Sequence, residues 1–190
     1  WRALADSRLA GWVSMVNPAQ SASVATAMET ILRREGWQAG WAILRRAAAN
    51  ARSIAASGTS APIDVAQGDA AEAIAIDFYG RFQQQAVADG GSPDRVGYVD
   101  PVGFTAIDPD PIALLRGAPH PETARRFVEF ALSREGQLLW QLPAGVPDGP
   151  RRFALRRLPA SRAVWASDRA RFVDRVDPWT LAGAPAGVQG

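Results

Sequence analysis

A strand–helix alternation over residues 10–100 is the feature that most limits what this chain can fold into. Short runs of branched apolar residues predict strands, whereas apolar residues spaced by three and four predict amphipathic helices. Strands separated by helices favour a largely parallel or mixed sheet with helices packed on it. The predicted strands cover 12–16, 73–76 or 73–77, and 95–101, and the predicted helices cover 21–36, 38–51 and 81–91. Residues 57–68 are predicted to form a polar turn and a short helix that Gly68 terminates. The sequence therefore predicts an α/β fold.

The first two predicted helices have apolar stripes that should face the sheet. Ser21 or Ser23 provides an N-cap for the first helix, and Gly36 ends it. The stripe of this helix consists of Val24, Ala27, Met28, Ile31 and Leu32. The second helix has Trp41, Leu44 and Ala48 on one side. The tryptophans at 12, 37, 41 and 140 fall on apolar faces, and we expect them in the core.

The second half of the chain is more irregular. A Pro-rich connection leads into "PETARRFVEFALSREGQLLW" (121–140), which predicts a strong helix, a break near Ser133 and a second short helix. The inward side of the long helix is predicted to hold Ala124, Phe127, Val128, Ala131 and Leu132. From Pro143 onward Gly and Pro are frequent and periodicity is weak, so no regular element is predicted there.

Composition restricts the class of protein. With 47% hydrophobic and 21% charged residues, the chain has the composition of a soluble globular protein, and no stretch approaches the roughly 20 apolar residues of a membrane span. The isoelectric point is near 9.9 although the net charge is only +2, because Lys and Cys are absent and little titrates above neutrality. The arginines are scattered without an aromatic stacking platform, so we expect no nucleic-acid partner.

The residues that catalysis requires are scarce. The chain has one His, His120 in a Pro-rich loop, and no Cys, no nucleophile elbow, no phosphate loop and no metal-ligand spacing. Asp69 and Glu72 are better explained as solvated residues at a helix–strand junction. We expect a binding protein rather than an enzyme, with no cofactor and no resident metal.

Four motifs resemble those of a known family in their order along the chain. They are "GWVSMVNPAQSAS", "GDAAEAIAIDFYGR", "DPDPIALLRGAPHPETARRFVEFALSREGQLLW" and "GPRRFALRRLP". This series is similar to extracellular solute-binding proteins of bacterial ABC importers, and most of all to the branch related to ferric-iron and phosphorylated-solute binders. The likeness covers most of residues 1–157.

The resemblance implies a type 2 periplasmic-binding-protein fold with two α/β lobes and a solute held between them. Residues 1–97 would form the second lobe, with a mixed sheet flanked by helices. Residues 98–190 would supply a crossing strand, the helical part of a partial first lobe and a C-terminal segment. The chain would then be a fragment that lacks the N-terminal part of the first lobe, which could leave Phe127 and Phe130 without packing partners. The family also implies a membrane permease as partner and a periplasmic or extracellular location, with a lipid anchor as an option.

Two hydroxyl-bearing loops are candidates for binding an anion. "NPAQSAS" contains Asn17, Ser21 and Ser23 before a helix N-terminus, where N–H groups and the helix dipole favour negative charge. The family uses this loop for ligand contact, often with Ser-Gly-Thr where this chain has Ser21-Ala22-Ser23. In "SGTS" (57–60), Thr59 could add a hydroxyl. Ordinary helix capping is the alternative explanation for both loops.

The third candidate is the predicted strand end Asp77, Phe78 and Tyr79. The carboxyl ends of strands in open α/β sheets present residues to ligands. Asp77 could accept from hydroxyls or an amine, Phe78 could form a pocket wall, and Tyr79 could donate to a phosphate. If the solute is ferric iron, Tyr79 could ligate it as phenolate, with Tyr98 as the second phenol of the chain. A solvated strand end is the alternative.

The leading hypothesis is capture of a small anionic, for example phosphorylated, solute for import. A ferric-iron carrier, the solute-sensing domain of a regulator or receptor kinase, and a pure interaction module are the alternatives that the sequence leaves open.

Overall fold

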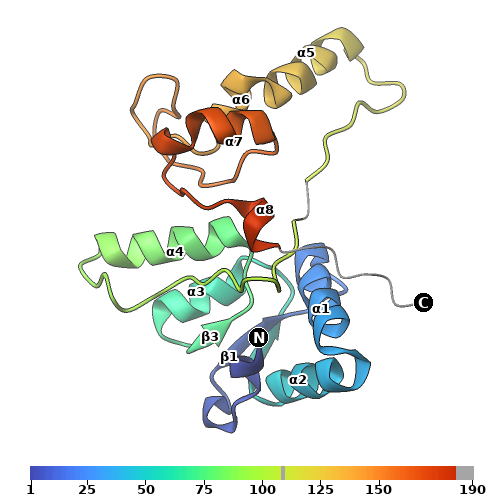
Figure 1. Cartoon of the computed structure of the whole chain (residues 1–190), viewed down its shortest axis with the longest axis vertical. Coiled ribbons are helices and arrows are strands. Elements are labelled where there is room, and N and C mark those ends of the chain that lie inside the picture. The colour runs from blue at the N-terminus through green and yellow to red at the C-terminus, as the bar shows by residue number, and fades with distance from the viewer. Residues whose placement is uncertain (108–109, 183–190) are drawn as a thin grey trace. The chain divides into compact units, whose positions relative to one another are not determined.

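A computed structural model describes residues 1–107 and 110–182. The described residues divide into two compact units (Figure 1). Unit 1 consists of residues 1–107 with 179–182, and unit 2 consists of residues 110–178. These units do not test the predicted boundary between lobes at residues 97 and 98, which stays a prediction.

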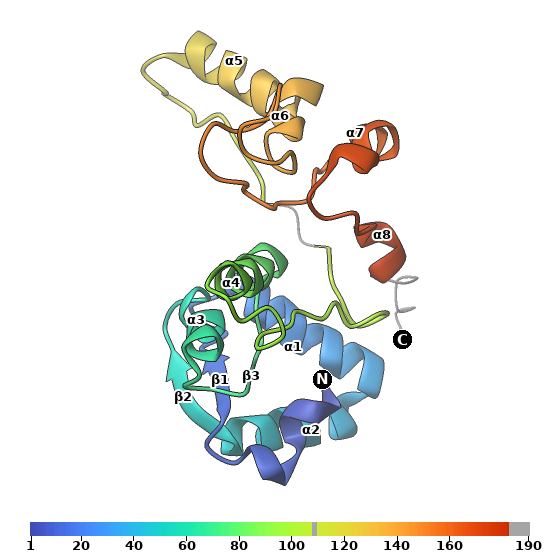
Figure 2. The ribbon, with the colours of Figure 1, turned by 90° about the vertical axis from the view of Figure 1, so that its left-hand side faces the viewer.

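The sheet of unit 1 has three parallel strands in the order β2-β1-β3 (Figure 2). They are β1 (Val13–Val16), β2 (Ala51–Ala55) and β3 (Glu72–Ala73). Val16 is level with Ala55 on one side of β1, and Val13 is level with Glu72 on the other. All four residues of β1 are buried, as expected for the central strand of a parallel sheet. The α/β fold is therefore confirmed for this unit, with a small parallel sheet flanked by helices.

Helices α1 (Ala22–Glu35) and α2 (Trp37–Ala49) connect β1 to β2, and Gly36 between them has a φ of 83° that favours glycine. The predicted stripe of α1 is confirmed, because Val24 and Ile31 are fully buried. The predicted inward side of α2 is wrong in part. Its buried residues are Gly40, Ile43, Leu44 and Ala47. Gly40 is the reason, since a Cβ there would lie 3.0 Å from the Leu32 backbone, and the bare glycine lets the two helices approach closely.

Because α2 packs against α1 through Gly40, its two tryptophans are exposed to solvent. Trp37 is 69% exposed and packs edge-to-face against Trp41 at 5.7 Å between ring centroids, and Trp12 is also half exposed. The expectation that these three side chains lie in the core was wrong. The core instead surrounds β1 and consists of Leu4, Val13, Met15, Val16, Val24, Ala47, Ala61 and Ile74.

Helix α3 (Ser60–Gln67) follows β2, a strand that was not predicted, and ends at Gly68, as predicted. The φ of 84° at Gly68 gives a left-handed cap. Helix α4 (Asp77–Asp89) follows β3. The predicted strand end over 73–77 is wrong, because β3 stops at Ala73 and Asp77 is already the first residue of α4. An acidic residue in a first turn interacts favourably with the helix dipole, which explains why the helix begins there.

Residues 95–101 form no strand, so the predicted crossing strand is wrong as well. The alternation in this segment has a different cause. Val96 is buried, and Tyr98 and Asp100 are partly buried against α4, while Gly97 and Val99 between them are exposed. The segment packs one side onto a helix without joining a sheet.

Unit 2 contains α5 (Pro121–Leu132), α6 (Arg134–Leu138) and α7 (Arg162–Asp168). The break at Ser133 is confirmed, and the Ser133 hydroxyl caps α6 by accepting from the N–H of Gly136. On α5, the predicted inward residues Phe127 and Leu132 are 61% and 59% exposed, and Phe130 is exposed too. The short elements of the chain are η1 (Arg2–Ala5), η2 (Ser7–Leu9), η3 (Arg169–Arg171) and α8 (Pro178–Leu181).

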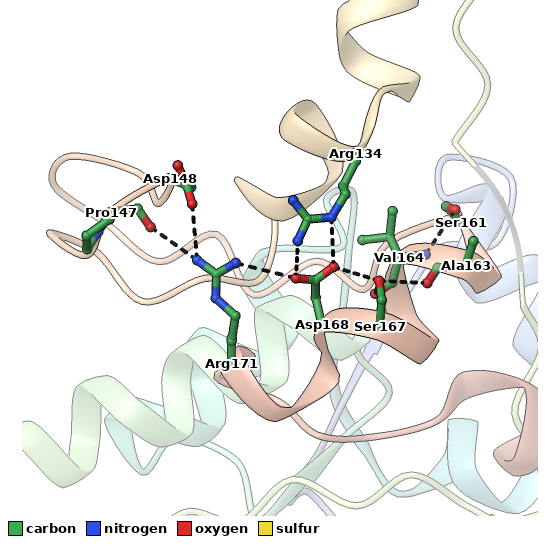
Figure 3. A network of polar contacts seen from close by, with 9 residues as sticks. All are labelled: Arg134, Pro147, Asp148, Ser161, Ala163, Val164, Ser167, Asp168 and Arg171. Atoms are coloured by element: carbon green, nitrogen blue, oxygen red, sulfur yellow. Dashed lines mark hydrogen bonds and ion pairs between the residues drawn. The ribbon is translucent and has the colours of Figure 1, made fainter.

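Buried polar groups join the elements of unit 2. Asp168 at the end of α7 accepts from Arg134 of α6 at 2.5 and 3.1 Å and from the Ser167 hydroxyl at 2.7 Å, and it also pairs with Arg171 (Figure 3). Arg171 in turn reaches Asp148. Of the described helices, none is long and apolar enough to cross a membrane.

Candidate functional site

The three strands of unit 1 are parallel, and each is followed by a helix at the carboxyl edge of the sheet (Figure 2). The chain passes from β1 to β2 on one side and then to β3 on the other side of β1. The direction of winding therefore reverses at β1. In open α/β sheets, ligands bind outside the carboxyl ends of the strands at such a reversal. The loops after β1, β2 and β3 are the candidate site.

Asn17 shapes the loop after β1. Its N–H donates to the carbonyl of Ala55 at the end of β2 at 2.9 Å, which ties this loop to the neighbouring strand. Its side-chain oxygen accepts from the N–H of Ala19 at 2.9 Å, which closes a turn just before α1. Asn17 therefore has a structural role at the edge where we predicted it.

Ser21 occupies the N-cap position of α1, yet its hydroxyl makes no capping hydrogen bond to the described part of that helix. A Cβ on Gly58 would lie 3.5 Å from the Ser21 Oγ, so the loops after β1 and β2 are in contact. In the second loop the hydroxyls of Ser57 and Thr59 lie 2.8 Å apart. Ser23 sits in the first turn of α1. The structure thus brings Ser21 together with the 57–59 loop, and whether these groups bind a solute stays a prediction.

Asp77, Phe78 and Tyr79 form the first turn of α4 rather than a strand end. They still follow β3, so they lie beyond the same edge of the sheet as α1 and α3. The rings of Phe78 and Tyr79 are 4.3 Å apart, and both residues are half-buried. A solute role for these three residues also stays a prediction.

Sequence reasoning missed the residue that organises this turn, Arg81. Its side chain is only 5% exposed and bridges two carboxylates, Asp77 at 2.9 Å and Asp100 at 2.6 Å. Its guanidinium also lies over the ring of Tyr98, 5.1 Å from the centroid. The spacing of four between Asp77 and Arg81 is a helical ion-pair signal that could have revealed both the helix and the pair.

Gly80 allows the Tyr98 ring to sit against α4. A Cβ at position 80 would lie 2.2 Å from a ring carbon of Tyr98, so only glycine permits this approach. Burial raises the pKa of the Tyr98 phenol well above its ordinary value, and the charges of Asp100 and Asp77 raise it further against the opposing effect of Arg81. Tyr98 is therefore a protonated phenol throughout the physiological range.

Other places in the described residues are weaker candidates. No group of three His, Cys, Asp or Glu side chains there could hold a metal ion. His120 precedes α5 in unit 2 and is exposed. A surface hollow lined by Ala3, Asp6, Arg8, Leu9 and Glu72 lies toward the amino end of β3. Two of its charged groups, Asp6 and Arg8, already pair with each other, and hydrogen bonds from Arg8 lower the pKa of Asp6 to about 2.

Comparison with known proteins identifies relatives of this chain. The curated relatives include an uncharacterized protein of Haemophilus influenzae, 28% identical over 74% of this chain, and the phosphoglycerate transport regulatory protein PgtC of Salmonella typhimurium, 25% identical over 72%. The chain spans only 39% and 32% of the lengths of these two relatives. No solved structure matches the chain.

The family model for bacterial extracellular solute-binding proteins matches residues 1–141, which is well over half of the chain. The resemblance inferred from the four sequence motifs is therefore confirmed at the level of the family. The chain belongs to the bacterial extracellular solute-binding protein family.

Proposed function

We propose that this protein is the solute-binding component of a bacterial ABC importer and captures a small anionic, phosphorylated solute. The observation that carries the proposal is the meeting of two hydroxyl-bearing loops at the carboxyl edge of the sheet, with Ser21 beside Gly58 and its hydroxyl not used for capping α1. Backbone N–H groups at the start of α1 add the positive end of a helix dipole. These groups suit a phosphate or carboxylate.

In this proposal Ser21, Ser23 and Thr59 contact the anionic group, while Phe78 and Tyr79 at the start of α4 contact the rest of the solute. A relative named as a phosphoglycerate transport regulatory protein supports a phosphorylated solute. The protein would work outside the cytoplasmic membrane and deliver its solute to a membrane permease, with a lipid anchor as one way of keeping it there.

The test is binding of phosphoglycerate to the full-length protein, measured by calorimetry and by thermal unfolding. A solute at 100 times its dissociation constant stabilises the native state by about 2.7 kcal/mol. Replacing Ser21 and Ser23 by Ala should weaken binding by at least tenfold, because each hydrogen bond lost to a charged group costs about 1.5–3 kcal/mol. Ser92→Ala, in an exposed loop of the same unit, is the matched control. Equal binding of glycerate and phosphoglycerate would contradict the proposal.

The ferric-iron alternative is less well supported. Ferric ion requires several anionic oxygen ligands, and Tyr98, the second phenol of the chain, is held in its protonated form. Tyr79→Phe separates the two alternatives. It should reduce the affinity for a phosphorylated solute only modestly, whereas loss of a purple iron–phenolate absorption band in this variant would establish iron binding.

A sensing role is the second candidate, and it is favoured by the word "regulatory" in the name of the relative PgtC. Deleting the gene distinguishes the two roles. Loss of uptake of the labelled solute supports import, whereas intact uptake with loss of a transcriptional response to the solute supports sensing.

A further inference from the structure

We propose that Arg81 is a positioning residue of the solute site and that Asp77 belongs to the Arg81 ion-pair cluster and does not contact the solute. This inference rests on the proposed function of the same site. The cluster consists of Arg81, Asp77, Asp100 and Tyr98, and it connects the first turn of α4 to the extended segment 96–101.

The burial of the cluster supports this assignment. Arg81 is 5% exposed and Asp100 is 14% exposed, whereas Asp77 at the rim is 31% exposed. A guanidinium removed from water must be paired, and Arg81 is paired through one nitrogen with each of the two carboxylates. Asp77 therefore serves to neutralise a buried cation at the start of α4.

The charge of the cluster gives Arg81 its effect on the neighbouring solute site. The four described members of the cluster, two carboxylates, one guanidinium and the protonated phenol of Tyr98, sum to a net charge of minus one. Without Arg81 the sum would be minus two at the same edge of the sheet as the loops that are proposed to bind an anion. Arg81 thus limits the repulsion of an anionic solute, and it also fixes the turn that carries Phe78 and Tyr79.

Asp77→Asn separates this proposal from a direct role of Asp77. The variant removes one negative charge, so it should tighten phosphoglycerate binding, on the order of threefold at low salt for a charge several ångströms away. The gain should disappear between about 0.01 M and about 1 M salt, where the screening length falls from about 30 to about 3 Å. Weaker binding in Asp77→Asn would show that Asp77 contacts the solute and would overturn the proposal.

Charge rescue distinguishes positioning from a purely structural role. Arg81→Met should weaken binding of phosphoglycerate, and the double variant with Asp77→Asn, which restores a net charge of minus one, should recover part of the affinity. Absence of any recovery would overturn the electrostatic part of the proposal. If Arg81→Met fails to fold, Arg81→Lys keeps the charge, and Asp77→Asn still gives the decisive result.

Glu29→Gln is the matched control, because Glu29 forms an exposed ion pair with Arg33 at the same spacing on α1 and the change in charge is identical. It should leave phosphoglycerate binding unchanged, and an equal gain of affinity in this variant would assign the effect to net charge alone and overturn the proposal.

A readout without solute separates this inference from the proposed function. In nitrogen NMR spectra, the terminal guanidinium nitrogens of Arg81 should give separate signals in the wild type, since two carboxylates restrain their rotation. These signals should merge in Asp100→Asn. If phosphoglycerate does not bind but the separate signals are present, the proposed solute is wrong and the cluster stands. If the signals are merged in the wild type, the cluster itself is wrong.

Discussion

The two units of the chain are stabilised by different kinds of interaction. Unit 1 has an apolar core around a buried strand, in which Val13, Val16 and Ile31 are at most 1% exposed. Unit 2 buries polar side chains, and its Gln141 is fully buried while Asp168 and Asp174 are nearly so. Apolar contacts are non-directional and tolerate small changes, whereas buried charges demand particular partners. Outside its Arg81 cluster, unit 1 should therefore be less sensitive than unit 2 to the loss of one charged group and to acid.

The largest effect is expected for Asp174→Ala in unit 2. The Asp174 carboxylate accepts from Arg156 at 2.5 and 3.0 Å and from the side-chain amide nitrogen of Gln141. The backbone N–H of Asp174 donates to the side-chain oxygen of Gln141. Removing one partner of a buried pair leaves an uncompensated charge, so unfolding should become easier by about 3–5 kcal/mol. Denaturant unfolding of the variant measures this loss.

Asp148→Ala is the control for Asp174→Ala, because it removes an exposed partner of Arg171 at 3.3 Å. Exposed ion pairs contribute about 0–1 kcal/mol. Similar losses in the two variants would contradict the view that the buried ion pair of Asp174 stabilises unit 2 more than an exposed pair does.

A smaller effect is expected in unit 1 from Ile31→Val. Ile31 is fully buried, and removal of one methylene from a packed core costs about 0.5–1.5 kcal/mol. Ile54→Val on the edge strand β2, where the side chain is 61% exposed, should change the stability by less than about 0.5 kcal/mol. The comparison of urea midpoints tests whether the apolar core or the sheet edge stabilises unit 1.

The smallest effect should appear only in acid. Burial alone would raise the pKa of Asp168, but hydrogen bonds from Ser167 and Arg134, the charge of Arg134 and a hydrogen bond from Arg171 together lower it. The folded state then binds this proton less readily than the unfolded chain. The stabilisation is fully present above the ordinary Asp pKa of about 3.9 and is lost as pH falls through the lowered folded value.

Asp168→Asn should remove this acid-dependent loss, measured as the slope of unfolding free energy against pH below about pH 4. Because Arg134 is 58% exposed, solvent screens the pair and the effect should be modest. An unchanged slope in the variant would contradict the lowered pKa of Asp168.

Much of the fold could be predicted from local patterns. The stripe of α1, the helix end at Gly68 and the break at Ser133 each depend on a few neighbouring residues, and all three are confirmed. The predicted burial of Trp41 failed because it depends on a distant contact. The periodicity of apolar residues predicts which side of a helix is buried. In α2 the buried side is centred elsewhere because Gly40 lets the helix approach Leu32 closely, and a single sequence carries no signal for this approach.

The candidate site could be predicted in part. Ser21 and the 57–59 loop were both predicted as candidates for binding an anion. They come together because they follow adjacent parallel strands, and the second of these strands, β2, was not predicted. The run "AIAIDFYG" was misassigned because branched residues favour a strand, while the pair of Asp77 with Arg81 commits the chain to a helix earlier. In residues 95–101, buried and exposed side chains alternate because one side of the segment packs on α4. This alternation has the same period of two as a strand.

Unit 1 is completed by residues that come after unit 2. The N–H of Gly103 donates to the carbonyl of Leu181 at 2.8 Å, and Arg34 donates to the carbonyl of Ala182. During synthesis, which proceeds from the N-terminus, the sheet and its helices can form first. These last bonds must wait until the roughly seventy residues of unit 2 have left the ribosome. The nascent chain therefore carries an unfinished unit 1 through the whole translation of unit 2, an interval in which chaperones and proteases have access to it.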